Sequence, residues 1–168
     1  MFAQIKNSMK ELIWNYGSSQ EILNKKLAYL VGIESKNIMA LAGAAQIYPI
    51  IRNIFSEKKV CFPDITFGEY SRIFPNAIKY NDMFDKGLTL EQSINKSDLI
   101  IIVNPNNPSG RIYHTQNIYK LAKDYPAKYF LIDESFIEYS EEESILKILE
   151  IKPKKNVIVL KSLSKSHG

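Results

Sequence analysis

The chain has 168 residues, of which 45% are hydrophobic and 24% are charged. These are the proportions of an ordinary globular domain, so they argue against disorder, a collagen-like repeat or a membrane span, and the length predicts one domain. Lysine and arginine outnumber aspartate and glutamate by 22 to 18, but the cations are spread along the chain. We therefore predict no nucleic-acid partner and no membrane partner.

The chain contains a single cysteine, Cys61, which cannot form an internal disulfide. Its place inside a Val-Cys-Phe run predicts a small buried apolar residue and not a nucleophile. A reducing cytoplasm is the simplest compartment for such a chain. The first ten residues lack the apolar core and small-residue cleavage site of a secretory signal.

The first half of the chain shows hydrophobic spacing typical of helices. A capping-box serine, Ser18, precedes apolar positions that predict a helix over about 19–31. The short apolar run 37–42 predicts a strand, Gly43 a tight turn, and 44–55 a helix.

The remaining sequence alternates strand-length apolar runs with helical spacing. Strands are predicted at Lys59–Pro63, Ala77–Tyr80, Leu99–Val103, Tyr129–Ile132 and Val157–Leu160. Helices are predicted at about Gly68–Ile73, Leu90–Ile94, Thr115–Asp124 and Ser144–Leu149. Continuous Ile, Leu and Val strands interleaved with helices predict an α/β fold, a mostly parallel sheet with helices on both faces.

Ligands bind such sheets at the carboxyl ends of the strands. Four segments are expected at that edge: Gly43-Ala44-Ala45, Asn104–Gly110, Asp133–Phe136 and Lys161–Gly168. Taken alone, each segment can be explained without a ligand, as a turn, a helix cap or an exposed lysine. Together they bring an amide, a carboxylate and an amine to the ends of three consecutive strands, which favours a functional site at this edge of the sheet.

Three motifs carry a resemblance to a known family. They are Asn-Pro-Asn-Asn-Pro-Ser-Gly at 104–110, Asp-Glu-Ser-Phe at 133–136 and Ser-Leu-Ser-Lys-Ser-His-Gly at 162–168. They resemble the signatures of pyridoxal-phosphate enzymes of the aspartate-aminotransferase fold, also called fold type I, class I/II. Within it the chain is most similar to the histidinol-phosphate aminotransferase and threonine-phosphate decarboxylase branch. The resemblance covers about Tyr16 to Gly168 and implies the large, cofactor-binding domain.

The resemblance implies a role for one residue of each motif. Lys165 would form the imine with the aldehyde of pyridoxal 5'-phosphate and later move the α-proton. Asp133 would keep the pyridine nitrogen protonated, since a nearby carboxylate stabilises the cation. Asn107 would donate a hydrogen bond to the ring oxygen.

Further residues are implied around the ring and the cofactor phosphate. Phe67 matches the aromatic residue that stacks on the ring. Backbone N–H groups of Gly43, Ala44 and Ala45, which open a helix, would bind the phosphate together with the hydroxyl of Ser162 and, as a weaker candidate, Ser164. Tyr16 resembles a tyrosine that reaches across a dimer interface to the partner's phosphate, so a homodimer is implied. No metal site is predicted.

The resemblance also implies a domain organisation. Residues 1–17 would be an N-terminal arm, and 18–168 a partial large domain that is incomplete at its carboxyl end. The family's next glycine-rich strand, a phosphate-binding arginine and the C-terminal small domain would be absent, as expected for the first half of a longer enzyme. Open apolar sheet edges would then favour dimerisation or non-native association.

Several functions remain open from the sequence. The main hypothesis is an aminotransferase that acts on an amino acid or amino-acid phosphate. Phe136 stands where the aminotransferases commonly have tyrosine, which favours a threonine-phosphate-decarboxylase-like enzyme instead. An inactive fragment or binding module that retains the motifs is a third possibility, and a doubly wound binding domain without pyridoxal phosphate is the fourth.

Overall fold

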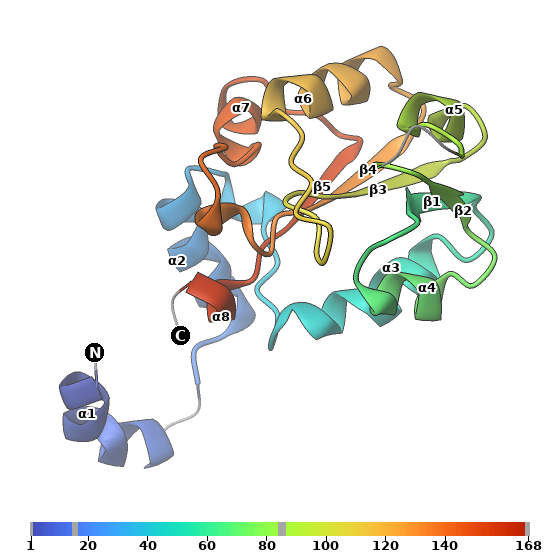
Figure 1. Ribbon diagram of the computed structural model, residues 1–168. Helices are drawn as coiled ribbons and strands as arrows, with labels where there is room; N and C mark the ends of the chain where they lie inside the picture. The colour runs from blue at the N-terminus through green and yellow to red at the C-terminus, as the bar shows by residue number, and fades with distance from the viewer. Residues whose placement is uncertain (1, 15–16, 84–86, 167–168) are drawn as a thin grey trace. The chain divides into compact units, whose positions relative to one another are not determined.

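The computed structural model describes residues 2–14, 17–83 and 87–166. The contacts divide the chain into two compact units, Met1–Ala40 and Leu41–Gly168. The first unit holds helix α1 (Phe2–Trp14), helix α2 (Gln20–Val31) and the 3-10 turn η1 (Ser35–Asn37). The second unit holds the whole sheet and the remaining helices (Figure 1).

The second unit is built on five parallel strands in the order β2-β1-β3-β4-β5. The strands are β1 (Val60–Pro63), β2 (Ile78–Tyr80), β3 (Leu99–Val103), β4 (Tyr129–Asp133) and β5 (Val157–Leu160). All five residues of β3 are buried, because it lies at the centre with helices on both faces. The predicted parallel α/β sheet is confirmed.

The helices of the second unit form two layers. They are η2 (Ala44–Gln46), α3 (Ile47–Ile54), α4 (Gly68–Ile73), α5 (Leu90–Ile94), α6 (Thr115–Asp124), η3 (Ile137–Tyr139), α7 (Leu146–Ile151) and α8 (Leu163–Ser166). Figure 1 shows α3 and α4 on one face of the sheet and α5, α6 and α7 on the other.

Each face of the sheet has its own hydrophobic core, because neighbouring residues of a strand point to opposite sides. The core under α3 and α4 includes Tyr70, Leu99, Ile101 and Leu131. The opposite core, under α5 and α6, includes Ile94, Ile100, Ile102, Ile118 and Phe130. Cys61 is a fully buried free thiol of this second core, as predicted.

Three local predictions are wrong. The predicted strand 37–42 is absent: Asn37 ends η1, and none of the described strands includes or pairs with 38–42. The N-cap of α2 is Ser19 and not Ser18, because the Ser19 hydroxyl accepts the N–H of Ile22. Helix α7 begins at 146 instead of Ser144, whose hydroxyl is held by the Glu134 carboxylate.

Candidate active site at the carboxyl edge of the sheet

Asp133 is a buried carboxylate at the end of β4, with 3% of its surface exposed. The Tyr70 hydroxyl donates to Oδ2 at 2.5 Å, and the Ser135 hydroxyl and N–H donate to Oδ1 at 2.6 and 3.0 Å. Burial, and then the charge of Asp133, raise the pKa of Tyr70 well above its usual value. The ion pairs found among the described residues do not include Asp133. Its charge is therefore held by hydrogen bonds alone.

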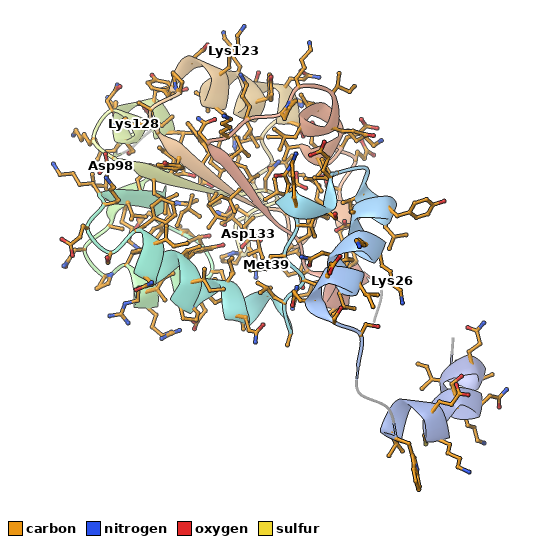
Figure 2. All side chains as sticks on the ribbon, turned by 180° about the vertical axis from the view of Figure 1, so that it is seen from behind. Lys26, Met39, Asp98, Lys123, Lys128 and Asp133 are labelled. Atoms are coloured by element: carbon orange, nitrogen blue, oxygen red, sulfur yellow. The ribbon has the colours of Figure 1, made fainter. Side chains whose placement is uncertain are left out.

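Asp133 lies inside the second unit, at the opposite end of the strands from Asp98 and Lys128 (Figure 2). Those two residues precede β3 and β4, so they mark the amino edge of the sheet. Asp133 therefore marks the carboxyl edge, where ligands of parallel sheets bind.

Phe67 is connected to Asp133 through two tyrosines. Its ring centroid lies 6.2 Å from that of Tyr48, which in turn meets Tyr70 edge-on at 5.6 Å. Burial raises the pKa of Tyr48 to about 12, with the charges of Asp133 and Glu69 adding to the effect. Phe67 itself is 43% exposed, so part of its side chain is open to solvent.

The sequence analysis identified neither Tyr48 nor Tyr70. A signal for Tyr70 was present, because it follows Phe67 by three residues, or about one helical turn. Nothing local showed that its hydroxyl would meet a carboxylate 63 positions away.

The loop after β3 is held by two buried asparagines. Asn104 closes it by donating to the Tyr113 carbonyl at 3.0 Å and accepting the Tyr113 N–H at 2.8 Å. Asn106 accepts the Thr66 hydroxyl and donates to the Ile65 carbonyl, both at 2.7 Å. The predicted Asn107, by contrast, is exposed. Asn106 therefore supports the loop, and the motif alone did not show which of the two neighbouring asparagines has this structural role.

Lys165 lies in α8, which follows β5, and its side chain is exposed. Its Nζ is 5.6 Å from the centroid of the Phe136 ring. Phe136 also lines a shallow hollow of about 210 Å³, to which Asn107 contributes. Phe136, which follows β4, therefore lies near both Asn107 and Lys165.

The turn before α3 approaches the Asp133 face of the sheet. Gly43 has φ +89°, a conformation that favours glycine. Ala44 packs against the core that contains Tyr48 and Tyr70, while Ala45 is exposed. The Oγ atoms of Ser162 and Ser164 lie 3.2 Å apart, Ser162 being buried. The predicted Tyr16 lies outside the described residues.

Over residues 2–14, 17–83 and 87–166, no three His, Cys, Asp or Glu side chains are grouped as metal ligands. None of the described helices is long and apolar enough to cross a membrane.

The family model "Aminotransferase class I and II" matches residues 3–168, so the chain belongs to that family. It is 28% identical to an L-serine phosphate decarboxylase of Campylobacter jejuni and 29% identical to a histidinol-phosphate aminotransferase of Blochmanniella pennsylvanica. The matches cover 95% and 88% of this chain but 45% and 43% of those proteins. The chain thus spans about half the length of the curated relatives it matches.

Solved structures share the fold of this chain. The crystal structure of an L-threonine-O-3-phosphate decarboxylase from Porphyromonas gingivalis superposes with a TM-score of 0.83 at 25% identity. That match covers 97% of this chain and 54% of the other.

Pyridoxal 5'-phosphate is the cofactor that membership of this family implies. The described residues fit it, because Asp133 is a buried carboxylate without a cationic partner and a protonated ring nitrogen supplies such a partner. Phe67 and Asn107, both exposed, follow β1 and β3 and so stand at the same carboxyl edge of the sheet.

Proposed function

We propose that this chain binds pyridoxal 5'-phosphate and carries the reactive lysine of an aminotransferase that acts on an amino acid or amino-acid phosphate. The observation that supports it most is the buried, cation-free Asp133 at the end of β4, beside the strand that leads to Lys165. Because the chain spans about half of its relatives' length, the proposal concerns the steps that these residues can perform.

Each residue has a distinct task in this proposal. The cofactor supplies an aldehyde and an electron-withdrawing ring when bound. Lys165 contributes the amine nucleophile, and its Nζ holds and returns the α-proton. Asp133 would stabilise a proton on the ring nitrogen, Asn107 would donate to the ring oxygen, and Phe67 would stack on the ring. Tyr70 keeps the Asp133 carboxylate oriented.

The phosphate would be held at the start of the helical segment that begins with η2. Backbone N–H groups of Ala44 and Ala45 precede α3, where the helix dipole favours an anion. The N–H of Gly43, which the sequence also suggested, donates instead to the Leu41 carbonyl at 2.8 Å. The hydroxyls of Ser162 and Ser164 add donors from the segment after β5.

Reconstitution with pyridoxal phosphate tests the proposal. The unaltered chain should develop a visible absorption band, and borohydride should fix the cofactor covalently onto Lys165. Lys165→Ala should lose both, while Lys147→Ala, which changes an exposed lysine of α7, should keep them. A band of equal strength in Lys165→Ala would refute the assignment.

A decarboxylase is the second candidate function. It is supported by Phe136, which has no hydroxyl for the ring oxygen, and by the L-serine phosphate and L-threonine-O-3-phosphate decarboxylases among the similar proteins. The two reactions give different products from a phosphoamino acid: carbon dioxide and an amine from decarboxylation, a keto acid from transamination. If Phe136 selects decarboxylation, Phe136→Tyr should shift the product ratio toward the keto acid.

We further propose that the chain works as a homodimer in the cytoplasm. Among the described strands, β5 pairs only with β4, so its other edge is open to a second chain. The N-terminal arm at 1–17 and the partial cofactor domain at 18–168 remain predictions. Sedimentation that shows a monomer at high concentration would contradict the dimer.

A further inference from the structure

Beside Asp133, the next residue of the chain is also a buried carboxylate. Glu134 has 1% of its surface exposed. Since neighbouring side chains alternate along a strand, it points to the face opposite Asp133. Its Oε1 accepts the Ile145 N–H at 2.7 Å, and its Oε2 accepts the Ser144 hydroxyl at 2.5 Å. Glu134 is therefore anchored on the α7 side of the sheet, away from the proposed cofactor.

Glu134 is linked to the segment that carries Lys165. Its N–H donates to the Leu160 carbonyl at 2.8 Å, which extends the pairing of β4 with β5. The Lys161 ammonium lies 3.5 Å from Glu134 Oε2 and 2.6 Å from Glu138 Oε1. Only 20% of the Lys161 side chain is exposed. Lys161 is thus an inward-facing cation four residues before Lys165.

A second contact lies at the other end of this segment. The Tyr139 hydroxyl donates to the main-chain carbonyl of Lys165. Helix α8 has four residues, far fewer than an isolated helix needs in water, so outside contacts must fix it. Segment 134–139 supplies such contacts at both Lys161 and Lys165.

We propose that Lys161, paired with Glu134 and Glu138, is a positioning residue that fixes the Lys165 segment against the end of β4. That the position of Lys165 matters rests on the proposed function. The restraint of segment 162–166 by Lys161 does not depend on a cofactor. Removing Lys161 would leave the buried Glu134 with neutral donors only, and the first turn after β5 would lose its side-chain link to β4.

Hydrogen exchange of the chain without cofactor tests the restraint. Lys161→Met keeps the apolar stem and removes the charge. Amide exchange at 162–166 should become about tenfold faster, an effect larger than the loss of an exposed ion pair would give and smaller than the loss of a fully buried one. Amide exchange in β1 and β3 should not change. Lys161→Arg should restore slow exchange. Lys147→Met, which breaks an exposed pair with Glu143, should have no effect at 162–166.

The outcomes separate the two proposals. Unchanged exchange at 162–166 in Lys161→Met would overturn the positioning role, and so would an equal increase in β1 and β3, which would indicate general destabilisation. A second readout is the rate at which pyridoxal phosphate, fixed by borohydride, labels Lys165; it should fall in Lys161→Met and recover in Lys161→Arg. If the unaltered chain is not labelled while the exchange result holds, the proposed function fails and the restraint stands.

Discussion

Replacing Tyr70 by phenylalanine should destabilise the chain through Asp133. The ring is fully buried against Tyr48 and Phe62, and phenylalanine keeps those contacts. What is lost is the 2.5 Å hydrogen bond to a buried carboxylate. Hydrogen bonds to charged groups contribute about 1.5–3 kcal/mol, so we expect a loss of about 2 kcal/mol. That is roughly a 30-fold change in the unfolding equilibrium constant.

Urea unfolding followed by circular dichroism measures this loss. With a slope of about 2 kcal/mol per molar urea, the midpoint should fall by about 1 M with the slope unchanged. Tyr48→Phe is the matched control, because its ring lies in the same cluster but its hydroxyl makes no hydrogen bond to the described residues. If Tyr48→Phe and Tyr70→Phe lower the midpoint equally, the hydrogen bond to Asp133 is not what stabilises the fold here.

Three further predictions concern other parts of the second unit. Burial raises the pKa of the Cys61 thiol to about 11, so a thiol reagent at neutral pH should label it only after unfolding; fast labelling of the folded chain would contradict its burial. Burial also raises the pKa of Glu134, so the folded state binds its proton more tightly than the unfolded state. Relative to Glu134→Gln, the unaltered chain should therefore lose stability as the pH rises. The loss begins near the pKa of the unfolded state, about 4.3, and is complete above the raised pKa of the folded state. A stability difference between the two proteins that does not change with pH would count against this. Thr89→Ala removes one half of the capping box of α5 and should cost about 1 kcal/mol in thermal denaturation, more than Ser19→Ala at the exposed start of α2.

The sequence predicted the sheet well because its strands are short apolar runs with little ambiguity. β3 reads Leu-Ile-Ile-Ile-Val, which only a strand buried on both faces explains easily. The run at 38–42 has similar composition, yet it forms no strand among the described residues. Pairing depends on a neighbouring strand, which a local pattern does not show.

The site was predicted less completely than the sheet. Asp133, Lys165 and Asn107 stand in recognisable motifs that follow strands, so a place at the carboxyl edge of the sheet could be predicted for each of them. Tyr70 and Tyr48 could not be found in that way, since they contribute through side chains that meet residues far along the chain. Lys161 resembled any other lysine until its two acidic partners were placed beside it.

The order of the strands has a consequence for how the site opens. The chain leaves β1 toward α4 on one face and leaves β3 toward α6 on the other, so the loops after these adjacent strands diverge. A split of this kind is where parallel sheets form a ligand crevice. Here one amide ties its two sides together: Asn106, after β3, holds Ile65 and Thr66, after β1. The loops that flank the switch point are therefore joined by hydrogen bonds of the protein itself, before any ligand binds.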